Sequence, residues 1–280
     1  MNGLESKLLF PLGHFYSPIA DPDDLRARAH AIWARRDDMP GITMNVAAQL
    51  ALLQTVGVHA RDAAYPTDPP PDPTTYHYGN DQYPPLDALF LHGAIRHFRP
   101  RRMIEVGSGY SSLVTANVNR RYLGMSLEFT CIEPFPRQFL IDGVDGISGL
   151  RRQKVEEVEL DFFDRLGEND VLFIDSSHVV KIGSDVNFLL FDVLPRLKPG
   201  VLVHIHDVFL PDEYPKIWML DQCRNWNEQY VVRAFLQYNS AWEIVWAAHY
   251  MATRHPTEVT TAFLPARVQG GGSLWLRRLR

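Results

Sequence analysis

The chain has 280 residues, of which 46% are hydrophobic and 22% are charged, so it can bury the core of one large domain or of two small ones. Its formal net charge is −5 at pH 7, and a negative chain has no general attraction to nucleic acid or to anionic lipid. The sequence contains no apolar run of about 20 residues, the length of a membrane span. We therefore expect neither a nucleic-acid partner nor a membrane span.

Cysteine is used sparingly in this chain. Cys131 and Cys223 are far apart in the sequence and form neither a metal-binding motif nor a disulfide framework. This usage is typical of proteins in a reducing compartment. We therefore expect a cytoplasmic protein.

Residues 1–85 predict a helical segment that ends in a loop. The spacing of apolar residues predicts helices over Asp21–Arg36 and Met44–Val56. The stretch Tyr65–Pro85 is so rich in proline and tyrosine that it cannot form a helix or a central strand. We expect this N-terminal segment to cover a site on the main domain or to form the contact of a homodimer.

From residue 86 onward, strands alternate with helices. Short apolar runs predict seven strands, which are Arg102–Val106, Glu128–Ile132, Leu150–Val155, Val171–Asp175, Val201–His206, Trp242–Ala247 and Ser273–Arg278. Helical spacing predicts Leu86–Phe98, Ser111–Arg120, Pro136–Ile141, Val158–Leu166, Ile182–Leu197 and Tyr214–Leu236. The segment between the last two strands shows no strong helical pattern and ends at Gly270–Gly272, which allows an antiparallel final strand. We predict an α/β fold with a doubly wound, mainly parallel sheet of seven strands and an antiparallel terminal strand.

The most informative local motif is Met103–Ser112, in which an apolar strand runs into two glycines and then into serines. Gly107 and Gly109 allow a tight turn, and the N–H groups that open the next helix point into the same gap. Glu133 follows the second strand, where a carboxylate can accept hydrogen bonds from a ribose. The third glycine of a dinucleotide site is replaced by Ser112. This pattern favours a ligand that has a ribose but no pyrophosphate.

Polar residues also follow the fourth and fifth strands. The fourth strand ends in Asp175–His178, and the fifth ends in His206–Asp207. Because parallel strands end at one edge of a sheet, we expect these residues beside the glycine turn. Each of them could instead cap the helix that follows it, and the sequence leaves that alternative open.

Three of these stretches, Ile104–Ser112, Ile132–Pro134 and Phe173–His178, resemble motifs of the class I S-adenosylmethionine-dependent methyltransferases, in the bacterial branch related to small-molecule O-methyltransferases. The resemblance covers residues 86–280 and implies a Rossmann-like domain that binds S-adenosylmethionine. The residues implied to bind this cofactor are Glu105, Gly107, Ser108, Gly109, Tyr110, Ser111, Glu133, Pro134, Glu156, Asp175 and Ser176.

The resemblance also implies the reaction, which is methyl transfer to an oxygen of a small-molecule acceptor such as a sugar or a phenolic natural product. In the metal-dependent branch, residues at the positions of Asp175, His206 and Asp207 hold a divalent ion, so these three are the implied metal ligands. His178 stands at the position of that branch's lysine base, and a neutral imidazole can take a hydroxyl proton. The catalytic candidates are therefore His178, His206 and Asp175, with His206 either a ligand or a hydrogen-bonding histidine.

Two other functions stay open from the sequence. One is a nicotinamide-dependent oxidoreductase, which Ser112 and the antiparallel last strand disfavour. The other is a non-catalytic protein that keeps the methyltransferase fold as a scaffold. The acceptor site would be covered by Tyr65–Pro85, Gly13–Tyr16 and Phe209–Pro215, although aromatic residues in these stretches could equally attach the helical segment to the body.

Overall fold

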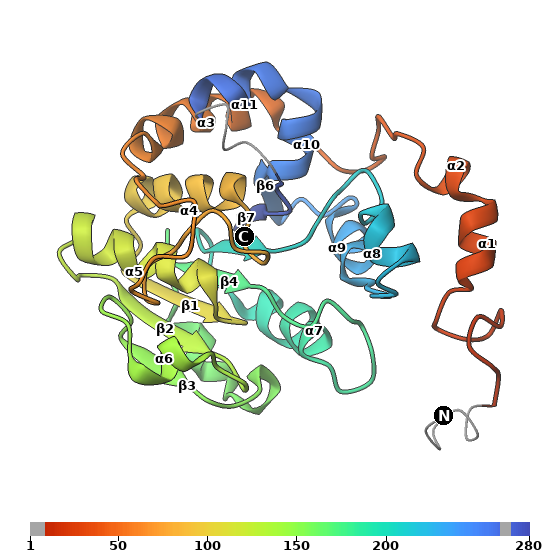
Figure 1. Cartoon of the computed structure of the whole chain (residues 1–280), viewed down its shortest axis with the longest axis horizontal. Coiled ribbons are helices and arrows are strands. Elements are labelled where there is room, and N and C mark those ends of the chain that lie inside the picture. Colours follow the sequence, from red (N-terminus) through yellow and green to blue (C-terminus); the bar gives the residue numbers. More distant parts are fainter. Residues whose placement is uncertain (1–8, 264–269) are drawn as a thin grey trace.

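The computed structural model describes residues 9–263 and 270–280, and its centre is a seven-stranded sheet (Figure 1). The strands are β1 Arg102–Val106, β2 Glu128–Ile132, β3 Gly149–Arg151, β4 Val171–Ile174, β5 Leu202–Ile205, β6 Trp242–Ala247 and β7 Leu274–Arg278. They lie in the order β3-β2-β1-β4-β5-β7-β6. Strands β1 to β5 are parallel, and β7 lies between β5 and β6, antiparallel to both. The predicted Rossmann-like sheet with an antiparallel terminal strand is confirmed.

Helices surround this sheet on both faces. Those before β1 are α1 Pro22–Ala27, α2 Ala29–Ile32, α3 Val46–Ala60 and α4 Pro85–Phe98. Those after β1 are α5 Tyr110–Tyr122, α6 Gln138–Asp142, α7 Asp185–Asn187, α8 Lys216–Leu220, α9 Glu228–Leu236, α10 Ala248–Arg254 and α11 Pro256–Ala262. Short 3-10 or π segments are η2 Val155–Glu157, η3 Leu160–Arg165, η4 Phe188–Val193 and η5 Leu194–Arg196. Within the described residues, none of the helices has the length and apolar character needed to span a membrane.

The alternation of side chains along each strand produces two hydrophobic cores. In β4, Phe173 faces the core that the sheet forms with α3, α4, α5, α10 and α11, whereas Leu172 and Ile174 face the core that contains η3, η4 and α9. The first core includes Phe90 of α4, which stacks on Trp246 of β6 with ring centroids 4.5 Å apart. A strand buried on both faces needs apolar residues at nearly every position, which is why β4 reads as a continuous apolar run.

The N-terminal part consists of two differently packed pieces. Helices α3 and α4 pack so closely that Gly93 lies against the backbone of Val56. By contrast, α1 and α2 bury none of their residues, and Figure 1 shows this segment at the periphery of the molecule. The single helix predicted over Asp21–Arg36 is therefore wrong, because these two short helices meet at Arg28 and end by Ile32.

The loop between α3 and α4 packs onto the body through its tyrosines. Tyr65, Tyr76, Tyr78 and Tyr83 are all buried, and the rings of Tyr65 and Tyr76 meet edge to face at 4.9 Å. The hydroxyl of Tyr76 donates to the carbonyl of Tyr83 at 2.8 Å. These contacts fix the end of the loop directly before α4.

The helices of the second half depart most from the prediction. The long helix expected over Tyr214–Leu236 is wrong, since the chain leaves helical geometry between α8 and α9 and adopts positive φ at Cys223 and Asn225. The helix predicted over Val158–Leu166 is η3, and the one over Ile182–Leu197 is divided among α7, η4 and η5. The segment after β6 was expected to lack helices, yet α10 and α11 form there because Met251 and Val259 join the first core.

Candidate functional site

The carboxyl ends of β1, β2, β4 and β5 meet at one edge of the sheet, as the parallel arrangement requires. Gly107 follows β1 with φ +81° and donates its N–H to the carbonyl of Ile132 at 3.0 Å. The N–H of Asp175 donates to Val106 at 2.9 Å. The chain order reverses beside β1, so a crevice opens at this edge.

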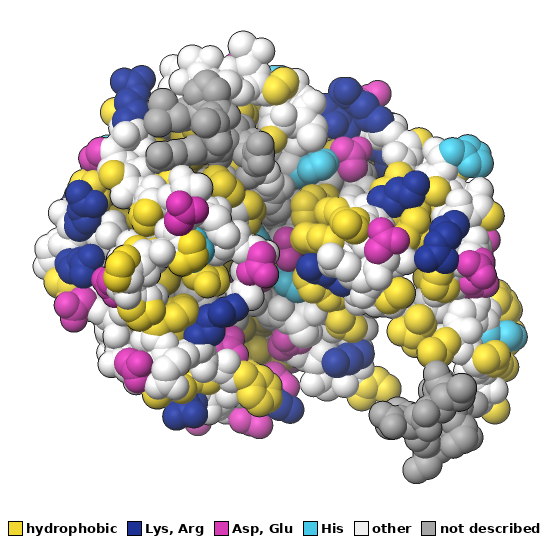
Figure 2. Space-filling model, viewed as in Figure 1, with side chains coloured by type: hydrophobic (Ala, Val, Ile, Leu, Met, Phe, Trp, Pro, Cys, Tyr) yellow, Lys and Arg dark blue, Asp and Glu magenta, His cyan; other side chains and the backbone are white. Residues whose placement is uncertain are grey.

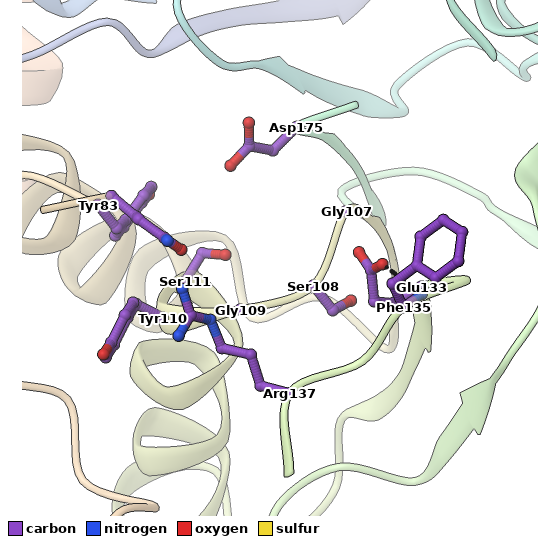
Figure 3. Close-up of a pocket in the computed structure, with 11 residues that line it drawn as sticks. Tyr83, Gly107, Ser108, Gly109, Tyr110, Ser111, Glu133, Phe135, Arg137 and Asp175 are labelled. Carbon is purple, nitrogen blue, oxygen red and sulfur yellow. Dashed lines mark hydrogen bonds between the residues drawn. The ribbon is translucent and has the colours of Figure 1, made fainter. Parts of the chain in front are cut away.

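A first cavity of about 240 Å³ lies above the glycine turn, and we call it the turn cavity. Its walls are Gln82, Tyr83, Gly107, Ser108, Gly109, Tyr110, Ser111, Glu133, Phe135, Arg137 and Asp175. Figure 3 shows these side chains around the start of α5, with Asp175 and Glu133 on different sides of the space. Arg137 supplies a positive charge to this wall, and its Cζ lies 5.1 Å from the centroid of the Tyr110 ring.

A second cavity of about 450 Å³, the Glu156 cavity, shares Glu133 and Asp175 with the turn cavity. Six residues predicted to bind the cofactor line it, namely Gly107, Glu133, Pro134, Glu156, Asp175 and Ser176. One carboxylate oxygen of Glu133 accepts the N–H of Phe135 at 2.8 Å, and burial raises the pKa of this carboxyl above its ordinary value.

Glu105 lies beneath the glycine turn and is not among the residues that line either cavity. Its carboxylate accepts hydrogen bonds from the hydroxyls of Ser111, at 2.6 Å, and Ser112. The thiol of Cys131 lies 3.6 Å away. Burial raises the pKa of Glu105 to about 7. Glu105 thus joins the start of α5 to β1, and its contact with the cofactor stays a prediction.

A third cavity of about 930 Å³, larger than the other two, lies at this edge, and we call it the Trp cavity. Its walls include Phe209, Trp218, Arg224 and Trp226 as well as Asp175, His178 and Asp207. Residues Tyr78–Pro85 of the tyrosine-rich loop contribute to the same walls. Figure 2 shows a hollow near the middle of the visible face, with acidic and histidine side chains at its margin.

His178 lies at the centre of a group of carboxylates. Its Nδ1 is 2.9 Å from Oε2 of Glu228, and its Nε2 is 3.2 Å from Oδ1 of Asp175 and 3.6 Å from Oδ2 of Asp207. Burial opposes a charge on the ring, but hydrogen bonds with Asp175 and Glu228 outweigh it and raise the pKa of His178 well above its ordinary value. Burial works to raise the pKa of Asp175, yet His206 and His178 keep it below the ordinary range.

Comparisons with known proteins decide the family. The family described as "Methyltransferase domain" matches residues 104–208, which contain the glycine turn, Glu133 and both polar strand ends. An uncharacterized protein from Archaeoglobus fulgidus is 37% identical over 166 residues, which make up 58% of this chain and 75% of that protein. The chain belongs to the class I S-adenosylmethionine-dependent methyltransferases.

Solved structures similar to this methyltransferase are distant in sequence. An apo structure of CmcI-N160 covers 71% of this chain and 72% of its own, with 14% identity and a TM-score of 0.43. The structure of a putative O-methyltransferase from Klebsiella pneumoniae matches 92% of this chain and 96% of its own, with 14% identity and a TM-score of 0.39.

The methyltransferase brings most of the predicted site residues together, with two differences at the implied metal ligands. The donor atoms of Asp175, His178 and Asp207 lie within 4.8 Å of one another. His206 does not belong to that group: its Nε2 lies 3.7 Å from Oδ1 of Asp207, and its buried Nδ1 has no hydrogen-bond partner among the described residues. Two carboxylates and one imidazole are a donor set that suits Mn²⁺, Fe²⁺ or Zn²⁺.

His204 in β5 and His206 directly after it point to the same side, as strand alternation predicts, and their ring centroids lie 5.5 Å apart. The ring of His204 stacks on Phe173 with centroids 3.8 Å apart, and burial holds the pKa of His204 well below its ordinary value. The ring of His206 lies 5.1 Å from that of Tyr83. His204 is therefore a core residue, whereas His206 lies under the loop that borders the site.

Sequence reasoning missed several residues of this methyltransferase site, and it named Gln82 and Tyr83 only within the loop expected to cover the acceptor. Arg137 precedes a short helix without any motif. Arg224, Trp226 and Glu228 were assigned to the interior of a long helix. Asn225 carries a local signal for a break in this helix, because asparagine tolerates the left-handed conformation that it adopts here.

Proposed function

We propose that this methyltransferase transfers the methyl group of S-adenosylmethionine to an oxygen of a small-molecule acceptor. The observation that carries the proposal is that Asp175 lines all three cavities, so the turn cavity, the Glu156 cavity and the Trp cavity meet at one carboxylate. The donor takes the first two cavities. The acceptor takes the Trp cavity, next to His178.

The donor cavities match the parts of S-adenosylmethionine. Glu133 stands between the two cavities and accepts hydrogen bonds from the ribose hydroxyls. Glu156 borders the adenine, with Pro134 and Ser176 beside it. Residues 107–111 offer backbone groups to the methionine part, and Arg137 is the cation for its carboxylate. Asp175 faces the amino group and the sulfonium.

His178 is the general base of the proposed reaction. As the acceptor oxygen forms its bond to the methyl carbon, the bond from that carbon to sulfur breaks, and the hydroxyl proton passes to Nε2 of His178. The carboxylates of Asp175 and Glu228 raise the pKa of His178 above its ordinary value, which makes its unprotonated ring a stronger base than a free imidazole. The positive charge of a sulfonium near Asp175 acts in the opposite direction and favours the neutral ring.

The acceptor is a sugar or a phenolic molecule. The rings of Phe209, Trp218 and Trp226 give the Trp cavity flat apolar walls, while Asn80, Asp81 and Gln82 give it polar ones. Flat faces with hydroxyl groups at their edges are common to both classes. Because Gln82 lines the turn cavity as well as the Trp cavity, we propose that residues 65–85 cover the site.

A divalent ion on Asp175 and Asp207 would supply a positive charge beside the acceptor oxygen. The donor group formed with His178 fits such an ion by donor type and spacing. Methyl transfer before and after treatment with EDTA separates the two roles of this group. If EDTA abolishes activity and Mn²⁺ or Zn²⁺ restores it, then Asp175, His178 and Asp207 bind a metal ion that the reaction needs. If activity is unchanged, no such ion is needed and His178 is free to act as the base.

The experiment for the whole proposal combines binding with turnover. Calorimetry should show binding of S-adenosylmethionine and S-adenosylhomocysteine, and a panel of catechol, 3,4-dihydroxybenzoate, glucose and glucuronate should reveal a methylated acceptor. His178→Ala should remove turnover while S-adenosylhomocysteine still binds, and His30→Ala on the exposed face of α2 is the matched control. Absence of cofactor binding would overturn the proposal, and binding without turnover would favour a scaffold.

A further inference from the structure

A buried carboxylate, Glu228, lies beside His178, on the side of the ring opposite Asp175 and Asp207. It is the first residue of α9, its side chain is 3% exposed, and its Oε2 lies 2.9 Å from Nδ1 of His178. Among the described residues, His178 is the only basic side chain that pairs with it. Apolar residues of similar volume can often replace a buried ion pair without loss of stability, so stability alone does not explain a carboxylate at this position.

The chain around Glu228 also holds the backbone of His178. The N–H groups of Asn227 and Glu228 both donate to the carbonyl of His178, at 3.1 and 3.2 Å. The side-chain oxygen of Asn227 accepts the N–H of Val180 at 2.6 Å. His178 has φ +60°, a left-handed conformation that persists only where neighbours enforce it.

The ring of His178 is restrained as well. Trp226 lies against the ring, with ring centroids 4.3 Å apart. Glu228 forms a hydrogen bond with Nδ1. Nε2 is therefore the nitrogen on the side of Asp175 and Asp207, two of the carboxylates that line the Trp cavity. When Nδ1–H donates its hydrogen bond to Glu228, a neutral imidazole carries its lone pair on Nε2.

We propose that Glu228 is the positioning residue of the base: it fixes the ring and the tautomer of His178 so that Nε2 receives the proton of the acceptor. The acceptor's proton ends on Nε2, while Glu228 remains the acceptor of the hydrogen bond from Nδ1–H. The inference rests on the proposed function, since it presumes that His178 is the base. A purely structural pair would tie α9 to the segment after β4 and leave the reaction unchanged.

The test removes the negative charge of Glu228 while keeping the shape of its side chain. Glu228→Gln should lower kcat at least about 100-fold with the best acceptor of the panel, while KM for that acceptor and Kd for S-adenosylhomocysteine stay within about threefold. Glu243→Gln, on β6 beside Arg277, is the matched control. Glu228→Asp keeps the charge at a shorter reach and should recover part of kcat, which separates a lost charge from a damaged fold.

A second measurement does not depend on the acceptor. In the full chain with ¹⁵N-labelled histidine, the Nδ1–H of His178 should give a downfield ring proton resonance that is lost in Glu228→Gln and kept in Glu243→Gln. A kcat within threefold of wild type in Glu228→Gln, or an unchanged resonance, would overturn the role of Glu228. Full activity in His178→Ala would instead overturn the assignment of the base.

Discussion

Gly107 lies directly against the backbone of Asp175. A Cβ added to Gly107 would stand 1.6 Å from the carbonyl oxygen of Asp175, and the φ of Gly107 is +81°. At Gly109, a Cβ would meet nothing within 4 Å. The two glycines of the turn therefore differ in purpose: Gly107 lets the ends of β1 and β4 approach each other, and Gly109 leaves the floor of the turn cavity open.

The first prediction follows from this difference. Gly107→Ala should lower the free energy of unfolding by about 3 kcal/mol or more, because both the contact with Asp175 and the backbone conformation become unfavourable. Gly109→Ala should change it by less than about 1 kcal/mol and weaken S-adenosylmethionine binding at least about tenfold, since the new methyl group enters the cofactor space. Urea unfolding and calorimetry measure the two effects. Equal stability of both variants would contradict the division of roles.

The second prediction concerns the pH dependence of stability. The pKa of Glu105 is raised from 4.5 to about 7 in the fold, so the folded state binds a proton that the unfolded state has lost between these values. The stabilising effect of that proton is complete below pH 4.5 and is lost as the pH rises through 7, at a cost of up to about 3 kcal/mol.

Glu105→Gln removes this titration, because an amide stays neutral at every pH. The stability of the variant relative to wild type should therefore increase from pH 5 to pH 8.5 in urea unfolding of the ligand-free protein. Glu243→Gln, at a partly exposed site, should show no such trend. A difference between Glu105→Gln and wild type that is the same at both pH values would argue against the raised pKa.

The third prediction concerns the cation of the turn cavity. Among the described residues, Arg137 is the only Lys or Arg that lines this cavity. Arg137→Gln should weaken S-adenosylmethionine binding about tenfold, the typical effect of losing one exposed charge-assisted hydrogen bond, and Arg137→Lys should keep part of the affinity. Arg152→Gln, at an exposed position, serves as control in the same calorimetric titration. If Arg137→Gln binds like wild type, another group holds the methionine carboxylate.

The fourth prediction tests how the N-terminal helices are attached. A Cβ on Gly93 of α4 would lie 2.5 Å from the backbone oxygen of Val56 on α3. Gly93→Ala should lower the free energy of unfolding by about 1–3 kcal/mol and increase proteolysis of α3, because the two helices must separate. At Gly149 of β3, a Cβ meets nothing within 4 Å, so Gly149→Ala is the control. Wild-type resistance to proteolysis in Gly93→Ala would show that α3 shifts without cost.

Much of the edge at which we propose that the cofactor binds could be predicted, because its residues lie within local motifs. Gly107, Glu133 and Asp175 each follow a strand, and the fixed hand of strand connections brings such ends to one edge. The function of Glu105 was harder to predict, since a residue at the end of a strand can face the ligand or the helix. Here its carboxylate bonds to Ser111 and Ser112 under the turn.

The other half of the site depends on contacts between distant parts of the chain. Helical periodicity over Tyr214–Leu236 predicted one continuous helix, but the chain breaks between α8 and α9, and Trp218 and Trp226 line the Trp cavity on both sides of the break. Packing of these rings around the site outweighs the local preference for helix. No sequence pattern links Glu228 to His178, which stand fifty positions apart.

The sequence by itself determined the sheet, the glycine turn and the strand-end residues that identify a methyltransferase, because apolar periodicity and strand connections are local properties of the chain. The tertiary structure alone decided which side chains surround His178. Glu228, Trp226 and Gln82 reach the site from a broken helix and a proline-rich loop. Their positions follow from burial and hydrogen bonding in the folded state, which local patterns do not encode.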